Sequence, residues 1–295
     1  MKPKTNRAFR TSLLIIAGLI IICWALVWIK TGAHPGAPRF AAFLAVSFFM
    51  SMLASWIFYG FTDETFIPSA EISAEIQQIY HQQNPDPPKL RWPKRLFDIL
   101  LAIFGIMISL PIWLAIIILI WLQDPGPILF IKHCSGYQGR PFRLYKFRTM
   151  KINAEVETGP IVSQGQDQRV KGISKILRKT ALDELPQLIN ILLGEMSFVG
   201  PRPLRSVVEI KNIQNIPGYT QRYNSLPGLA GLAQICGDNL LPSRDKLRYE
   251  RVYTEHAGVL FDIKLFLIAC LVVFVLRWKK DWDGRIPRRW IRFGS

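Results

Sequence analysis

The chain has 295 residues, half of them hydrophobic, and its mean hydropathy is positive. Lysine and arginine outnumber aspartate and glutamate by 37 to 21, which gives a formal net charge of +16. This composition excludes an ordinary soluble domain and indicates a membrane protein. The basic excess flanks apolar segments, so we expect membrane lipid and phosphorylated substrates as partners, and no nucleic acid. The four cysteines are widely spaced without a C-x-x-C pair, which predicts neither a disulfide framework nor a zinc site.

Two apolar segments near the start of the chain predict a transmembrane helical hairpin over 1–64. Runs of 19 and 23 uncharged residues follow Arg10 and Arg39. At ~1.5 Å per residue, each run is long enough to cross ~30 Å of hydrocarbon. Basic residues before the first run place the N-terminus in the cytoplasm, and a retained anchor is favoured over a cleaved signal. Residues 65–93 are predicted to form an amphipathic piece followed by an extended, proline-rich linker.

Segment 94–123 contains a third apolar run, Ile99 to Leu122, with basic residues on both sides. A straight span would place one basic flank outside, which the positive-inside rule opposes. A re-entrant helix that enters and leaves on the cytoplasmic side satisfies both flanks. Ser109-Leu110-Pro111 near its middle predicts a kinked or broken helix, because proline lacks a backbone N–H and serine can satisfy a freed carbonyl. A straight third span with a tolerated proline is the alternative.

Residues 124–276 are predicted to form a cytosolic catalytic domain of the α+β class, mostly helical with a small β-hairpin. Strand patterns cover Ile128 to Ile131 and Phe142 to Phe147, and helical patterns cover Ile173 to Leu177 and Leu185 to Leu193. The 12 uncharged residues of Leu265 to Leu276 are too few to span, so they should lie in the membrane interface or pack on the core. The basic, tryptophan-rich tail 277–295 fits an interfacial anchor and a disordered segment equally well.

Two strings in this domain hold the residues expected to carry chemistry: LRKTALDELPQL at 177–188 and GEMSFVGPRPL at 194–204. Asp183 and Glu184 are adjacent carboxylates among basic residues. Thr180 with Asp183 fits a capping box, and Pro186 is best tolerated near a helix start, so the carboxylates are expected in or near a first turn. Neighbouring residues on a helix point about 100° apart, so the two carboxylates should have different roles.

Phosphoryl chemistry explains why carboxylates and basic residues belong together here. A carboxylate that attacks a diphosphate meets an anion, so cations or a helix N-terminus must cancel the repulsion. Glu184 can hold Mg²⁺, a hard cation that takes oxygen ligands. Arg178 and Arg202 can grip phosphate oxygens bidentately, and prolines on both sides of Arg202 stiffen its backbone. The plainer interpretation is that Asp183 and Glu184 only cap a helix and pair with Arg178 and Lys179 on a solvated face.

The ordered motifs resemble the monotopic polyprenyl-phosphate phosphoglycosyl transferases, also called bacterial sugar transferases. The resemblance starts at KRLFD and ends near Asp262. Its segments are KRLFD at 94–98, PGP at 125–127, KFRTM at 146–150, the two strings above, and PGLAGLAQ at 227–234.

The resemblance implies a ping-pong reaction on the cytoplasmic face of the bacterial inner (plasma) membrane. Asp183 would attack the sugar-bearing phosphate of a UDP-sugar, release UMP and hold a covalent phosphosugar, which polyprenyl (undecaprenyl) phosphate would then accept. Such a reaction starts a surface polysaccharide or glycoconjugate. The resemblance also implies that the re-entrant helix is a real feature, and a homo-oligomer is compatible with it.

The resemblance also assigns roles to individual residues. Asp183 and Glu184 would be catalytic, with Glu184 as the Mg²⁺ ligand. Arg178 and Arg202 match the family's phosphate-handling arginines. Apart from the resemblance, Lys179, Lys146 and Arg148 are further candidates for binding substrate phosphate. The run from Lys146 to Lys151 can also contact lipid headgroups or form a solvated face.

Four positions depart from the family pattern. Arginine is common where this chain has Cys134, and also where it has Asp238. Glu250 stands where we expect aspartate, and Gly258 where serine is common. The first two keep a second hypothesis open, a catalytically silent membrane scaffold of a glycan-assembly complex. A basic membrane-surface binding module without enzyme ancestry is a more distant alternative.

Overall fold

A computed structural model of the chain describes residues 68–124, 126–150, 170, 172–236, 241–279 and 286. The chain divides into two compact units, Met1–Tyr59 and Gly60–Ser295, and the described residues belong to the second. The hairpin predicted over 1–64 lies outside the described residues, and so does most of the tail 277–295.

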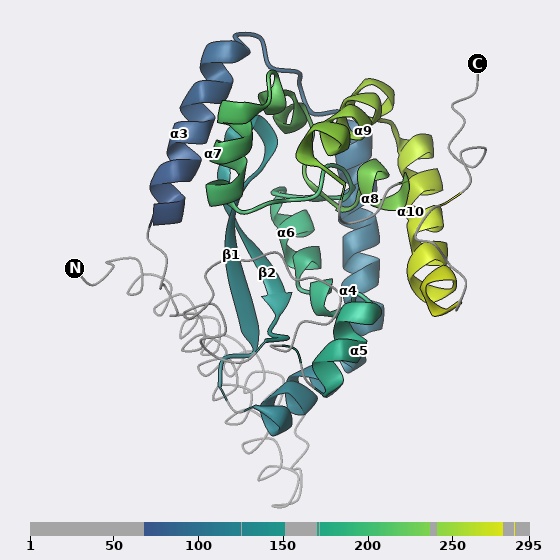
Figure 1. The fold of residues 1–295 in the computed structure, drawn as a ribbon. Helices are drawn as coiled ribbons and strands as arrows, with labels where there is room; N and C mark the ends of the chain where they lie inside the picture. The colour runs from purple at the N-terminus through teal and green to yellow at the C-terminus, as the bar shows by residue number, and fades with distance from the viewer. Residues whose placement is uncertain are drawn as a thin grey trace, which may run out of the picture. The chain divides into compact units, whose positions relative to one another are not determined.

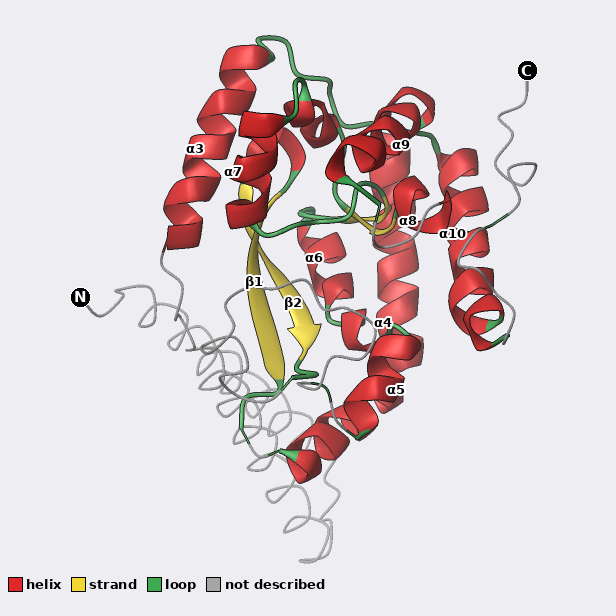
Figure 2. Cartoon of the chain, in the orientation of Figure 1, coloured by secondary structure: helices red, strands yellow, loops and turns green. Residues whose placement is uncertain are grey.

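The described part is mostly helical with two small sheets, in agreement with the α+β expectation (Figures 1 and 2). The helices are α3 (Pro68–Gln83), α4 (Trp92–Gln123), α5 (Ile173–Lys179), α6 (Gln187–Leu193), α7 (Ser206–Asn215), α8 (Leu232–Cys236), α9 (Ser243–His256) and α10 (Val259–Phe274). The strands are β1 (Leu129–Ser135), β2 (Pro141–Phe147), β3 (Ser197–Val199) and β4 (Gly228–Ala230). Short 3₁₀ turns occupy Tyr137–Gly139, Leu182–Glu184, Tyr219–Asn224 and Leu276–Trp278.

The predicted β-hairpin is confirmed. Strands β1 and β2 pair antiparallel with Phe130 opposite Lys146 and Cys134 opposite Phe142. Because side chains alternate along a strand, Phe142 and Leu144 face the core on the side that also carries Lys146. The same face also carries Lys132, which lies opposite Leu144, so the hairpin brings two lysines close to the apolar core.

A second sheet, not predicted from the sequence, consists of β3 paired in parallel with β4. Each strand has only three residues, too few for an alternating pattern to stand out. The segments that contain the two strands approach so closely that a Cβ added to Gly200 would lie 2.1 Å from the carbonyl oxygen of Leu226. Glycine is thus required where β3 runs into the Pro201-Arg202-Pro203 segment.

Helix α4 is the one described helix that is long and apolar enough to cross a membrane, by length and composition. It runs for 32 residues with Pro111 in its interior. Ser109 Oγ donates to the carbonyl of Gly105 at 2.6 Å, so serine bonds back into the turn before the proline. Figure 1 shows the ribbon bending between the part beside α6 and the part beside α5. The predicted break is therefore a bend within one continuous helix.

Most of the α4 surface is apolar and exposed. Its exposed large side chains are Trp92, Leu96, Leu100, Ile103, Phe104, Met107, Ile108, Leu110, Ile112, Leu114, Ile118, Leu119, Trp121 and Leu122. A soluble protein rarely exposes so much contiguous apolar surface. This face is suited to contact with lipid.

Polar contacts tie the first part of α4 to the catalytic domain. Lys94 Nζ forms an ion pair with Asp262 of α10 and donates to Ser197 Oγ at 2.7 Å. Asp98 accepts from Ser197 Oγ at 3.0 Å and from the Phe198 amide at 3.1 Å. These buried groups fix α4 against β3 and α10.

The far end of α4 contacts the same domain. Gln123 Nε2 donates to Ser174 Oγ at 3.2 Å, and Gln123 Oε1 accepts from the Ile173 amide at 2.8 Å. Asp124 pairs with Arg148 after β2. Both ends of this long apolar helix are therefore attached to one folded unit.

Helix α3 lies within the segment predicted to be amphipathic, and it packs on the catalytic domain. Ile76 and Tyr80 are fully buried against Tyr223. Ser73 and Tyr80 also form hydrogen bonds across the contact, with Ser206 and Asn224. Residues 84–91, which follow α3, contain no helix or strand.

Helix α10 includes most of the short apolar run near the end of the chain. Leu265 and Val272 are buried in the main core, whereas Leu260, Leu267 and Phe274 are exposed. One side of α10 therefore packs on the core, which was one of the two alternatives predicted from the sequence.

Candidate active site

The two adjacent carboxylates lie in the 3₁₀ turn Leu182–Glu184, between α5 and α6. The predicted capping box is wrong, because Thr180 Oγ1 donates back to the carbonyl of Ile176 at 2.8 Å and so completes the end of α5. Ala181 ends that helix in the left-handed conformation, with φ of +57°. Helix α6 then starts at Gln187 with Pro186 at its N-cap. Asp183 and Glu184 are thus near the first turn of α6, as expected, but they lie in the short 3₁₀ turn that precedes this helix.

Asp183 is a buried carboxyl, with 8% of its surface exposed. Burial raises its pKa to about 6, and the nearby Lys146, Arg178 and Arg202 limit that rise. The charge of Glu184 raises the pKa further. At neutral pH Asp183 is therefore mostly ionised, poorly hydrated and surrounded by cations, which suits a carboxylate nucleophile.

Glu184 has a different environment. Its Oε1 lies 2.5 Å from Lys146 Nζ and 2.8 Å from Arg202 Nη2. Burial alone would raise the pKa of Glu184, but these two cations lower it well below its ordinary value. Glu184 therefore stays ionised at any pH near neutrality. Two neighbouring carboxylates whose pKa values are pushed apart are suited to separate roles.

The surroundings of the pair carry an excess of positive charge. Lys132 of β1 donates to the carbonyl of Pro203 at 3.2 Å. Burial lowers the pKa of Lys132, and the neighbouring cations Lys146, Arg202 and Arg205 lower it further. More cations than carboxylates gather here, as a site for a diphosphate requires.

Lys132 and Arg205 are the functional candidates that sequence reasoning missed. The strand pattern held a usable signal, because Lys132 and Lys146 occupy diagonal positions on the same face of the hairpin. No local pattern pointed to Arg205, whose position depends on α7.

Two predicted phosphate ligands make other contacts. Arg148 is buried, and its guanidinium lies 3.6 Å from the carboxylate of Asp124 at the end of α4. Lys179 is exposed and stacks over the ring of Trp278 at 3.9 Å. The structure thus brings Lys146, Arg178 and Arg202 to the carboxylate pair, while contact of Arg148 and Lys179 with phosphate stays a prediction.

The departures from the family pattern fall in different places. Cys134 is fully buried in the main core, and burial raises its pKa to about 11, so its thiol is neutral. Glu250 is buried and pairs with Arg222 at 3.0 Å. Gly258 precedes α10 in an extended conformation. Asp238 lies outside the described residues.

A metal at this site would rest on few protein ligands. Among the described residues, no group of three or more His, Cys, Asp or Glu side chains is arranged to hold a metal. Mg²⁺ commonly takes one or two protein carboxylates and completes its shell with water and substrate phosphates. Glu184 can supply one such carboxylate.

The bacterial sugar transferase family matches residues 89–276, which is more than half of the chain. A Bacillus subtilis (strain 168) protein with the provisional name undecaprenyl-phosphate N-acetylgalactosaminyl 1-phosphate transferase is 48% identical over 132 residues, 45% of this chain and 73% of that protein. The chain belongs to the bacterial sugar transferase family.

Two other relatives carry names for a different sugar. The UDP-glucose:undecaprenyl-phosphate glucose-1-phosphate transferase of Caulobacter vibrioides is 42% identical, over 59% of this chain and 67% of that protein. The protein of the same name from Escherichia coli (strain K12) is 36% identical, over 62% of this chain. In this case the match spans only 40% of the relative's length.

Proposed function

We propose that the chain is a phosphoglycosyl transferase that moves a sugar-1-phosphate from a UDP-sugar to undecaprenyl phosphate, and so starts a surface polysaccharide or glycoconjugate. The family and the names of the relatives support this reaction class. One observation carries the proposal: the buried Asp183 lies beside a Glu184 that Lys146 and Arg202 hold ionised.

In the proposed first step, a carboxylate oxygen of Asp183 attacks the phosphorus that bears the sugar. The bond from this phosphorus to the bridging oxygen breaks, and UMP leaves with that oxygen. In the second step, a phosphate oxygen of undecaprenyl phosphate attacks the same phosphorus and releases the Asp183 carboxylate. Neither step needs a redox partner, and splitting the transfer in two lets one site serve both substrates in turn.

The basic residues around Asp183 supply the electrostatic part of this mechanism. Arg202 and Arg178 can each bind phosphate oxygens by paired N–H groups. Lys146 neutralises charge beside both carboxylates. Glu184 would hold Mg²⁺, which when bound supplies positive charge to the phosphates. Preorganised charge of this kind stabilises a transition state without rearrangement during the reaction.

The membrane part of the proposal places α4 as a re-entrant helix on the cytoplasmic face of a bacterial inner membrane. Contacts at both ends of α4 with one domain support it, since a straight span would put those ends on opposite sides. The exposed apolar side chains around the bend would then meet the lipid in which the polyprenyl chain dissolves. Cysteines introduced at Leu100 and Leu122 should both react with an impermeant thiol reagent from the cytoplasmic side only. Labelling from opposite sides would refute the re-entrant arrangement.

The reaction itself is tested by UMP release from a panel of UDP-sugars, with purified full-length protein, Mg²⁺ and undecaprenyl phosphate. Turnover with one donor, lost in Asp183→Asn and Glu184→Gln, supports the proposal and identifies the sugar. Folded, membrane-bound protein that releases no UMP from any donor would favour the silent scaffold instead.

A further inference from the structure

The segment 201–203, which carries Arg202 into the active site, is anchored at each of its three carbonyl oxygens. The donors are Gly228 N, Arg222 Nη2 and Lys132 Nζ, at 2.9, 2.7 and 3.2 Å in chain order. The two prolines also fix φ on either side of Arg202. With so little backbone freedom, the direction in which the Arg202 side chain leaves the segment depends on these three donors.

Arg222 is the central donor and is itself held tightly. Its Nη1 donates to Glu209 at 3.1 Å and to Tyr219 Oη at 2.6 Å. Its Nη2 donates to Glu250 at 3.0 Å and to the carbonyl of Arg202 at 2.7 Å. The guanidinium is buried, and its acceptors come from α7, α9, a 3₁₀ turn and the Arg202 segment. Such a fork has one geometry that satisfies all four acceptors.

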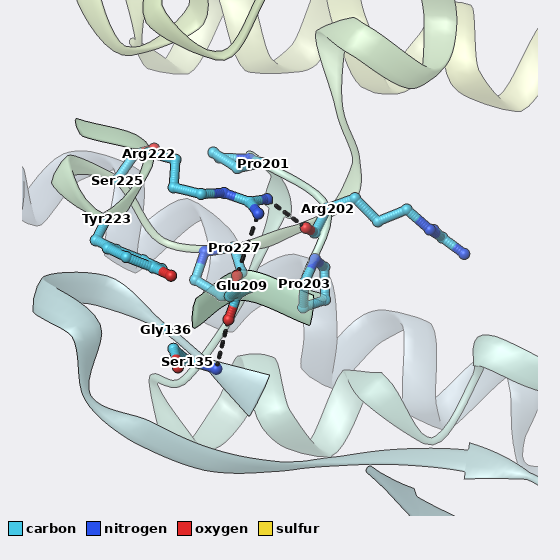
Figure 3. Close-up of a pocket in the computed structure, with 10 residues that line it drawn as sticks. All are labelled: Ser135, Gly136, Pro201, Arg202, Pro203, Glu209, Arg222, Tyr223, Ser225 and Pro227. Atoms are coloured by element: carbon cyan, nitrogen blue, oxygen red, sulfur yellow. Dashed lines mark hydrogen bonds and ion pairs between the residues drawn. The ribbon is translucent and has the colours of Figure 1, made fainter. Parts of the chain in front are cut away.

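Figure 3 shows how this arrangement aims Arg202. The guanidinium of Arg222 points at the carbonyl of Arg202, whereas the Arg202 side chain extends away from it. At its far end, Arg202 Nη2 reaches Glu184 at 2.8 Å. Arg222 thus binds the backbone of Arg202, while the side chain of Arg202 points the other way and binds the carboxylate of Glu184.

We propose that Arg222 is a positioning residue for the transfer reaction, and that it acts by fixing the backbone from which Arg202 reaches Glu184 and the substrate phosphate. Both Nη atoms of Arg222 are fully engaged, so it acts through Arg202 and does not bind substrate. Its kinetic consequence rests on the proposed function, whereas its effect on the 201–203 segment does not.

The kinetic test places Arg222→Met in the wild-type chain and in an Arg202→Ala chain. A displacement of about 1 Å at a catalytic group can cost about 100-fold in rate, so we expect kcat/KM to fall about 10- to 100-fold in the wild-type background. In the Arg202→Ala background the same change should cost less than about threefold, because residues that act as a unit are not additive. Equal losses in both backgrounds would overturn the proposal.

Hydrogen exchange supplies a readout that does not depend on activity. In full-length protein, Arg222→Met should speed exchange more in the peptide covering 200–205 than in α7 and α9, which lose only the ion pairs of Glu209 and Glu250. Tyr253→Phe is the matched control, because Tyr253 Oη makes a buried bond of the same 2.7 Å length to the carbonyl of Val199, just before this segment. The control should leave the 200–205 peptide unchanged.

The outcomes separate the two proposals. Unchanged exchange at 200–205 in Arg222→Met, or equally faster exchange throughout α7 and α9, overturns the positioning role. A wild-type protein that transfers no phosphosugar overturns the proposed function, while the exchange result still decides the role of Arg222. If Arg222→Met does not fold, Arg222→Lys carries both tests, because lysine keeps the charge but cannot bridge four acceptors.

Discussion

Asp183 and Glu184 are neighbours in one 3₁₀ turn, yet their surroundings move their pKa values in opposite directions. Burial dominates at Asp183, whereas the ion pairs with Lys146 and Arg202 dominate at Glu184. The turn therefore presents one carboxylate that is costly to ionise beside one that is always ionised. In the proposed reaction the first is the nucleophile, and the second organises the positive charge around it.

Lys146→Met should shift the acid limb of the pH–rate profile upward. Lys146 is the cation that most lowers the pKa of Asp183, so its removal raises that pKa above about 6. Since the nucleophile must be ionised, kcat/KM should then decline from a pH about one unit or more higher than in the wild type. Lys132→Met, which removes a bond to the Pro203 carbonyl, should lower activity without this shift. An acid limb at the wild-type position in Lys146→Met would contradict the assignment.

Asp183→Asn should abolish turnover and yet stabilise the fold at pH 8. The folded-state pKa of Asp183 is raised from 3.8 to about 6, so ionisation of Asp183 costs stability as pH rises through this window. Removing the carboxylate should then raise the free energy of unfolding by roughly 1–3 kcal/mol at pH 8, and by little at pH 4. Thermal unfolding at both pH values measures this. Asp245→Asn, at an exposed ion pair, is the control and should change stability only slightly. A less stable Asp183→Asn at pH 8 would show that the buried charge is better compensated than we infer.

The parts of the fold and the site that could be predicted are those that depend on residues close together in the sequence. The hairpin, α5 and α6 followed from short-range patterns, and Asp183, Glu184, Arg178 and Arg202 followed from a motif string. The capping box failed because Ala181 adopts the left-handed conformation, which the residue type does not suggest.

Long-range contacts account for the rest. The parallel pairing of β3 with β4 and the contact from Arg222 to the Arg202 backbone join segments about 20 to 30 positions apart. No periodic pattern in the sequence predicts these contacts. The same holds for Glu250, which in sequence was only a departure from an expected aspartate and in the structure neutralises Arg222.

Lys94→Met should weaken the attachment of α4 to the domain. The change leaves the carboxylate of Asp262 buried without its cation, and breaking a buried pair this way costs about 3–5 kcal/mol. Adding Asp262→Leu should recover part of the loss, because an apolar pair of similar size can replace a buried ion pair. Unfolding in detergent compares the variants, with the exposed Lys89→Met as control. No recovery in the double variant would mean that Lys94 acts mainly through Ser197.

Ala181→Gly should stabilise the protein. Alanine at a φ of +57° is strained by roughly 1–2 kcal/mol, and glycine adopts this conformation freely. The gain should be several tenths of a kcal/mol after the extra chain entropy of glycine is subtracted. Ala233→Gly in α8 makes the same change where the backbone is helical, and it should destabilise by about 1 kcal/mol. Equal losses of melting temperature in the two variants would show that residue 181 carries no strain.

The most direct test of the central claim is the intact mass of the purified protein after incubation with the donor sugar nucleotide and Mg²⁺ in the absence of undecaprenyl phosphate. The account predicts a mass increase of one sugar phosphate on the peptide containing Asp183, accompanied by UMP, absent in Asp183→Asn and discharged when undecaprenyl phosphate is added. A protein that turns over with both substrates present, but forms neither adduct nor UMP with the donor alone, would contradict it.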